Sequence, residues 1–98
     1  MKINKDAYTD AMFEGILKLN SVEECYKFFA DLCTPREIKS MSQRFTVAKM
    51  LLEKSVYSDI VSETGASTAT ISRVNRSFET GNDGYKMIFD RIADISGK

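Results

Sequence analysis

The sequence predicts an all-α protein of about six helices, in which two short helices and the turn between them form a helix-turn-helix over about residues 58–78. Two observations lead to this fold class. Apolar residues recur at intervals of three and four in successive segments, which is the period of an amphipathic helix. Residues that start or stop helices stand between these segments. With 98 residues, the chain is expected to form one domain, 1–98.

The first two helices are predicted over about residues 6–19 and 22–32. Ser21 and Glu24 form a capping box before the second helix, because the Ser hydroxyl accepts an amide three residues on while the carboxylate reaches back. An apolar stripe on the second helix is interpreted as a packing surface, the alternative being a ligand site. The stripe consists of Val22, Cys25, Phe28, Phe29 and Leu32.

A third helix is predicted to begin at the only proline. The segment Thr34–Glu37 supplies an N-cap Thr, a Pro at the first helical position and a Glu at the third. Helical spacing continues to about Lys54, and the residues from Ser55 to Ser58 interrupt it. The length of this helix suits a central scaffold. A last helix is expected over about residues 83–95.

Composition narrows the classes of function. The chain has no His, which excludes Ser-His-Asp, Cys-His and His-metal chemistry, so an enzyme is not expected. Cys25 and Cys33 lack metal-ligand spacing, and both are predicted to be reduced and partly buried. No metal site is predicted. We expect a cytoplasmic protein, since we find neither a long apolar run nor a signal peptide.

Charge is unevenly distributed along a chain whose formal net charge is zero. Residues 1–33 carry four basic and six acidic side chains, whereas residues 34–56 carry five basic and two acidic ones. Residues 57–79 are slightly acidic, because Asp59, Glu63 and Glu79 outnumber Arg73 and Arg76. Non-specific affinity for DNA is therefore expected to be modest, and binding must depend on shape and specific contacts.

The segment from Ser58 to Phe78 has the pattern of a helix-turn-helix. Ile60 and Val61 are predicted to face inward, and Gly65 supplies the left-handed conformation that ends the first short helix. Ser67 caps the second helix, whose Ile71 and Val74 return to the core. The alternative is a helical hairpin in an unrelated bundle.

The outer face of the second short helix is predicted to be small, polar and basic. Short side chains at its start let the backbone approach base edges in the major groove, while hydroxyls and guanidinium groups reach phosphates or bases. The candidate DNA-binding residues are Ser67, Thr68, Ala69, Thr70, Ser72, Arg73 and Arg76.

From about Leu32 to Phe78 the chain resembles the tryptophan-repressor superfamily, especially its YerC/YecD-type branch. The resemblance lies in Leu32–Pro35, Arg44, Gly65-Ala66 and the run from Ala69 to Arg73. It implies an intertwined, two-fold symmetric homodimer that binds double-stranded DNA with two recognition helices about one DNA turn apart. A repressor is the regulator that the resemblance favours. Dimerisation would also cover the aromatic side chains that a small domain cannot bury alone.

The resemblance further implies a possible ligand pocket. In the tryptophan repressor the indole of the corepressor lies between two arginines, matched here by Arg44 and Arg73, with a threonine and a serine nearby, matched by Thr34 and Ser77. The repressor has glycine directly after the second arginine, whereas this chain has Val74. We expect the Val74 side chain to fill the space of the indole, so that no tryptophan or other cofactor is needed.

A different class of function stays open at this point. A helical adaptor that does not bind DNA would use the same dimer surface to bind a protein partner, and the neutral net charge with acidic residues near the motif favours it.

Overall fold

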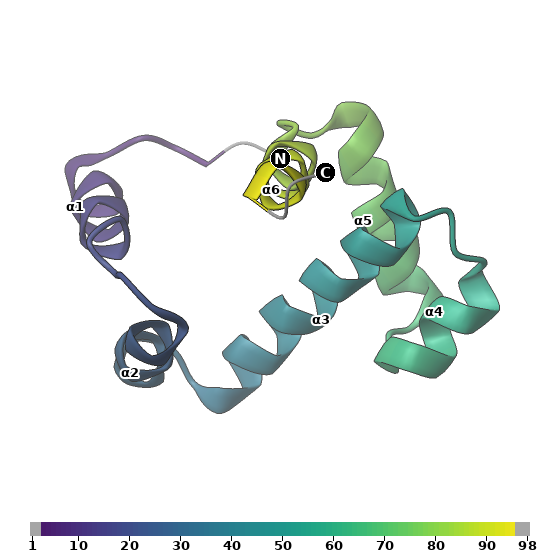
Figure 1. Cartoon of the computed structure of the whole chain (residues 1–98), viewed down its shortest axis with the longest axis horizontal. Coiled ribbons are helices and arrows are strands. Elements are labelled where there is room, and N and C mark those ends of the chain that lie inside the picture. The colour runs from purple at the N-terminus through teal and green to yellow at the C-terminus, as the bar shows by residue number, and fades with distance from the viewer. Residues whose placement is uncertain (1–2, 96–98) are drawn as a thin grey trace. The chain divides into compact units, whose positions relative to one another are not determined.

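The computed structural model describes residues 3–95, and within that range the chain forms α-helices and no strands, which confirms the all-α prediction (Figure 1). The helices are α1 (Ala7–Ile16), α2 (Val22–Leu32), α3 (Pro35–Leu52), α4 (Tyr57–Thr64), α5 (Thr68–Thr80) and α6 (Gly84–Ile95). The chain folds as two compact units, one up to Ile38 and one from Lys39 onward.

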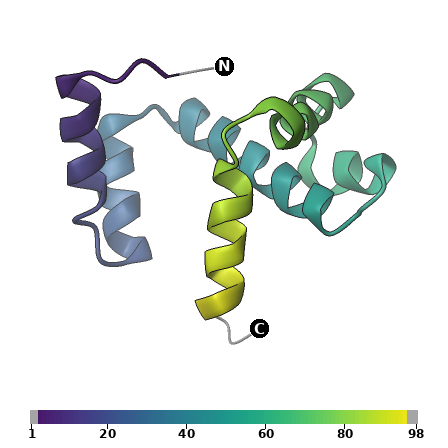
Figure 2. The same ribbon diagram turned by 90° about the horizontal axis from the view of Figure 1, so that it is seen from above.

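The first unit contains α1 and α2, which lie side by side and antiparallel (Figure 2). Asp6 caps α1, because its carboxylate accepts the Thr9 amide at 2.7 Å. At α2, Ser21 Oγ accepts the Glu24 amide at 3.1 Å, and the Glu24 carboxylate accepts the amide of Asn20 at 2.8 Å. The predicted capping box is therefore present, with its carboxylate bonded one residue further back than Ser21. Neither helix buries a side chain completely.

The second unit holds the core. Among the residues that the structure describes, six side chains are buried, and they come from α3, α4, the turn after α4, and α5, so the core joins the long helix to the two short ones. Each CH₂ group that they bury contributes about 0.8 kcal/mol to stability. The buried residues are Val47, Ala48, Ile60, Ala66, Ile71 and Val74.

Aromatic contacts attach α6 to the rest of the second unit. The ring centroids of Phe89 and of Phe45 on α3 are 4.8 Å apart, and those of Tyr85 and of Phe78 on α5 are 5.8 Å apart. The rings are tilted to each other by 34° and 36°, and both separations lie within the range in which aromatic pairs attract. The helix predicted over about residues 83–95 is thereby confirmed as α6, and it contacts both the scaffold helix and α5.

Three helix ends differ from the predicted ones. After Ile16 the amides of Lys18 and Leu19 bond to carbonyls three residues back, so α1 tightens and ends before Leu19. Lys54 adopts a left-handed conformation (φ 63°), which ends α3 at Leu52. The helix α4 begins at Tyr57, one residue earlier than predicted.

Two further predictions concern chemistry. Cys25 and Cys33 are both free thiols and half-buried, as the sequence predicts. Over residues 3–95, no group of three or more Cys, Asp or Glu side chains lies close enough together to hold a metal ion. In the same range no helix combines the length and the apolar character needed to cross a membrane.

Candidate nucleic-acid interface

The bend between α4 and α5 has the predicted geometry. Gly65 is left-handed, with φ 71° and ψ 7°, and its amide donates to the Val61 carbonyl at 2.8 Å, which closes the last turn of α4. The chain then reverses into α5, and the two helices pack against each other (Figure 1). This pair of helices is a helix-turn-helix.

Ser67 begins α5 as predicted. Its Oγ accepts the Thr70 amide at 3.1 Å and donates to Thr70 Oγ1 at 3.1 Å. The first turn of α5 carries no acidic side chain. The partial positive charge at the start of this helix is therefore left for an anion such as a DNA phosphate.

The inward face of the motif is mostly as predicted. Ile60 and Ile71 are fully buried, and Val74 is 3% exposed. The prediction that Val61 also faces inward is wrong, since Val61 is 38% exposed. Successive residues of a helix point about 100° apart. In the eight-residue α4 only Ile60 is buried, and its neighbour points outward.

The outward face of α5 carries the candidate DNA-binding residues. Thr70 departs from the prediction: it is half-buried, and its Oγ1 accepts a hydrogen bond from Ser67 Oγ. Arg73 and Arg76 lie one turn apart at i and i+3, so both guanidinium groups project from one side of α5. The exposed candidates are Ser67, Thr68, Ala69, Ser72, Arg73 and Arg76.

The helix-turn-helix also carries exposed acidic side chains. Asp59 and Glu63 are exposed on α4, and Glu79 is exposed near the end of α5. Over its described residues the helix-turn-helix thus exposes three carboxylates and two arginines, so its surface has no basic excess. Affinity that comes from phosphate neutralisation alone is small for such a surface.

One contributor to the motif was missed by sequence reasoning. Gln43 on α3 is half-buried, and its Nε2 donates to the Thr64 carbonyl, the last of α4, at 3.1 Å. The two residues are 21 positions apart, so no local pattern predicts the bond. The available signal is that Gln43 lies four residues before the buried Val47, on the side of α3 that faces the motif.

The four residues of the predicted ligand pocket occupy separate local settings. Thr34 caps α3, where its Oγ1 accepts the Glu37 amide at 3.1 Å. Arg44 is half-buried and donates to Ser40 Oγ at 2.9 Å, and Ser77 Oγ donates to the Val74 carbonyl at 2.6 Å. Arg73 is exposed on α5. A pocket made of these four residues stays a prediction.

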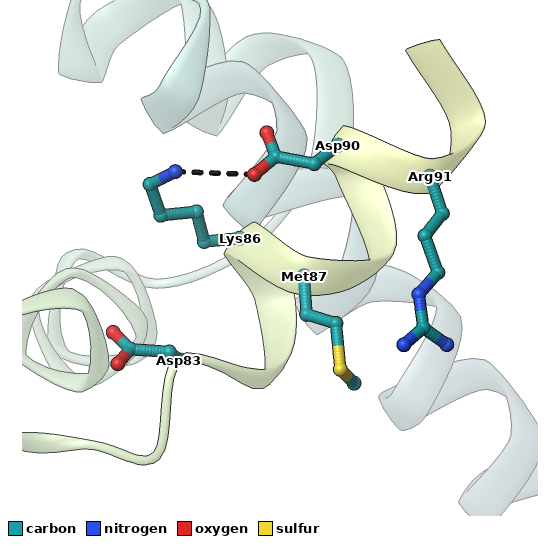
Figure 3. Close-up of a pocket in the computed structure, with 5 residues that line it drawn as sticks. All are labelled: Asp83, Lys86, Met87, Asp90 and Arg91. Atoms are coloured by element: carbon teal, nitrogen blue, oxygen red, sulfur yellow. Dashed lines mark hydrogen bonds and ion pairs between the residues drawn. The ribbon is translucent and has the colours of Figure 1, made fainter. Parts of the chain in front are cut away.

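A hollow of about 560 Å³ lies along α6, with different residues around it (Figure 3). The Lys86 ammonium group is 3.1 Å from the Asp90 carboxylate, and both side chains are about two-thirds exposed. An exposed pair of this kind contributes little to stability. The hollow is lined by Asp83, Lys86, Met87, Asp90 and Arg91, none of which belongs to the predicted pocket.

A helix-turn-helix with a polar, basic outward helix on an all-α scaffold defines a DNA-binding transcription regulator. The chain belongs to the Trp repressor protein family, which it matches over residues 7–93. It is 55% identical to the uncharacterised protein YerC of Bacillus subtilis (strain 168) over 85 residues, which cover 87% of this chain and 82% of YerC.

Two solved structures resemble this one closely. A TrpR-like protein from Eubacterium eligens has a TM-score of 0.88 and 55% identity, covering 91% of this chain and 92% of the other. A candidate Trp repressor from Staphylococcus aureus has a TM-score of 0.87 and 56% identity, covering 90% and 88%. The resemblance noted in the sequence is thereby confirmed at the level of family and fold.

Proposed function

We propose that this protein is a transcriptional repressor that acts in the cytoplasm, binds a two-fold symmetric operator as a homodimer, and needs no tryptophan to do so. The observation that carries the proposal is the outward face of α5, where Thr68, Ala69, Ser72, Arg73 and Arg76 are exposed while Ile71 and Val74 of the same helix are buried. The role is regulatory rather than enzymatic.

Direct contacts with bases and phosphates follow from the chemistry of this face. Short side chains at Thr68 and Ala69 allow the start of α5 to enter the major groove, where a methyl group can meet that of thymine. Arg73 and Arg76 have guanidinium groups that pair with phosphate or with the acceptor edge of guanine. In this proposal, Ser67 and Thr70 act mainly through the capped helix start, because their hydroxyls bond to each other.

Exposed apolar side chains support the homodimer. In the first unit Tyr8 is 91% exposed, Leu17 81% and Val22 74%. Large apolar side chains exposed in this number are typical of a surface that another chain covers. A second copy of this chain is the occupant we propose, and a two-fold symmetric pair would set its recognition helices about 34–36 Å apart, one turn of DNA.

The burial of Val74 supports independence from tryptophan. Val74 belongs to the core cluster together with Ile60 and Ile71. A ligand that needs the volume of this side chain would have to displace a packed core residue, which is costly in a close-packed interior. Arg44, Arg73, Thr34 and Ser77 would then support the fold or contact DNA instead of holding an indole.

Selection from random double-stranded DNA with the full-length protein tests the proposal. We expect enrichment of an inverted-repeat sequence, bound by a species that sedimentation equilibrium identifies as a dimer. Arg73→Ala should weaken binding to the selected sequence by about 1–3 kcal/mol. Arg91→Ala removes an exposed arginine on α6, outside the motif, and should leave binding unchanged.

The outcomes separate the proposal from its main rival. If no sequence is enriched, the DNA-binding role is wrong and a helical adaptor for a protein partner becomes the better interpretation. If a sequence is enriched but Arg73→Ala binds it as well as the unaltered protein, our assignment of α5 as the reading helix is wrong. Enrichment of a single half-site bound by a monomer would contradict the symmetric operator.

A further inference from the structure

We propose that Gln43 is a positioning residue for DNA recognition: its side-chain amide holds the last carbonyl of α4 and thereby sets the orientation of α5 relative to the scaffold helix α3. This inference rests on the proposed function, because it concerns how the recognition helix is presented to DNA. Gln43 itself is not placed among the residues that contact the duplex.

The bond joins two elements that are far apart in sequence. Gln43 Nε2 lies 3.1 Å from the carbonyl oxygen of Thr64, and both residues are half-buried. A carbonyl oxygen only accepts hydrogen bonds, so the amide must present its NH₂ group to Thr64. The last carbonyls of a helix have no partner within that helix, and Gln43 supplies one for Thr64.

Thr64 is in turn hydrogen-bonded to the turn that leads into α5. Its Oγ1 accepts the Ala66 amide at 3.1 Å and donates to the Ile60 carbonyl at 2.7 Å. Ala66 is buried, and the next residue, Ser67, caps α5. Hydrogen bonds thus run from α3 through the end of α4 to the residue before the α5 cap.

The packed core alone leaves this orientation less defined. The contacts of Val47, Ala48, Ile60 and Ile71 are apolar, and apolar contacts are not directional. A hydrogen bond requires a defined distance and angle, so the Gln43 amide restricts the tilt of the motif in a way that the core does not. We therefore expect its loss to affect sequence discrimination more than folding.

The test compares side chains of similar length at position 43 in the full-length protein. Gln43→Met removes the donor, whereas Gln43→Lys keeps an N–H donor. Ser42→Lys serves as the control for added charge, because Ser42 is exposed and its hydroxyl donates within α3, to the Lys39 carbonyl. For each variant we measure the affinity for the selected operator and for a random duplex at one salt concentration, and the ¹³C shift of the Thr64 carbonyl.

We expect Gln43→Met to lower the ratio of operator affinity to random-duplex affinity about fivefold, because α5 then meets the base edges in a less defined orientation. The Thr64 carbonyl shift should change in the same variant, and the midpoint of thermal unfolding should fall by only about 4–8 °C, as expected for the loss of one hydrogen bond. Gln43→Lys should have a higher affinity ratio than Gln43→Met, and the gain should exceed any change in the ratio that Ser42→Lys causes through its added charge.

Three results would overturn the inference. The first is an unchanged affinity ratio in Gln43→Met together with a changed Thr64 shift, since the bond would then be structural only. The second is an unchanged Thr64 shift, since the bond would then be absent in solution. The third is a Gln43→Lys variant no better than Gln43→Met.

If Gln43→Met does not fold, Gln43→Glu provides a second test. Gln43→Glu has the shape of glutamine and carries only acceptors at neutral pH, so it should show the same loss as Gln43→Met. Failure of the proposed function itself is recognised separately, because the unaltered protein would then select no DNA sequence at all.

Discussion

Thr34 and Glu37 satisfy each other's backbone amides at the start of α3. The Glu37 amide donates to Thr34 Oγ1 at 3.1 Å, and the Thr34 amide donates to the Glu37 carboxylate at 2.8 Å. Pro35 stands between them at the first helical position, where a missing N–H has no cost. The scaffold helix that supports the helix-turn-helix therefore begins at a complete capping box.

This capping box gives the protein a specific sensitivity to acid. The hydrogen bond from the Thr34 amide lowers the pKa of Glu37 below its ordinary value. A carboxyl group with a lowered folded-state pKa stabilises the fold above its unfolded pKa, about 4.3, and this contribution is lost as the pH falls through the folded value. We expect the melting temperature of Glu37→Gln to lie below that of the unaltered protein at pH 7 and the difference to shrink towards pH 3.

A parallel measurement at another cap checks the cause. The Thr9 amide and hydroxyl lower the pKa of Asp6 at the start of α1, so Asp6→Asn should show the same dependence on pH. A melting-temperature difference for Glu37→Gln that is constant between pH 7 and pH 3 would contradict the explanation.

Two left-handed residues, Gly65 and Lys54, are expected to respond in opposite ways to substitution. A Cβ at Gly65 would meet nothing within 4 Å, so only its backbone conformation (φ 71°) opposes another residue. Gly65→Ala should lower the free energy of unfolding by about 1 kcal/mol. Lys54 is also left-handed, with φ 63°, and Lys54→Gly should raise stability by about 0.5 kcal/mol. Urea unfolding measures both, and a loss of stability in Lys54→Gly would show that the Lys side chain matters more than its backbone.

Neighbouring residues on α5 should separate stability from DNA binding. Ile71 is fully buried, and Ile71→Ala should lower the free energy of unfolding by about 3 kcal/mol through lost contacts and a cavity. Ser72 is exposed, so Ser72→Ala should leave unfolding nearly unchanged while weakening binding to the selected operator. Denaturant titration and mobility shifts provide the two readouts. Equal operator affinity in Ser72→Ala would remove Ser72 from the interface.

Val74 predicts how the protein responds to tryptophan. Calorimetry of the unaltered protein should detect no tryptophan binding at micromolar concentration, because the Val74 side chain is packed in the core. Val74→Gly removes that side chain and should create a measurable affinity for tryptophan. Val47→Ala is the matched control: it also opens the core but at α3, and it should gain no affinity. Micromolar binding by the unaltered protein would show that Val74 does not occupy the ligand space.

Most of the fold could be predicted because its signals are local. The capping residues Ser21, Thr34 and Ser67, the single proline and Gly65 each act within four residues of their own position, so the sequence alone indicates the starts of α2, α3 and α5 and the end of α4. The family could be recognised from the motifs between about Leu32 and Phe78. The prediction that Ile71 and Val74 face inward on α5 was also correct, since helical spacing distinguishes these two residues from those between them.

The errors arose where tertiary contacts decide. Ile60 and Val61 are both apolar and adjacent, and only the packing of α4 against its neighbours shows that Ile60 enters the core. Thr70 is the exception, because its Oγ1 is bonded locally, to Ser67 Oγ three residues earlier. The contact of Gln43 with Thr64 spans 21 positions, so no periodicity or motif reveals it.

The division of α5 into a buried and an exposed side also bears on how such regulators diversify. Thr68, Ala69 and Ser72 lie at the surface, whereas the side chains that stabilise the motif lie on the opposite side of the same helix. Replacements at the surface positions therefore leave the free energy of folding nearly untouched. A duplicated gene could acquire a new target sequence through a few codon changes in this helix without first passing through an unstable ancestor.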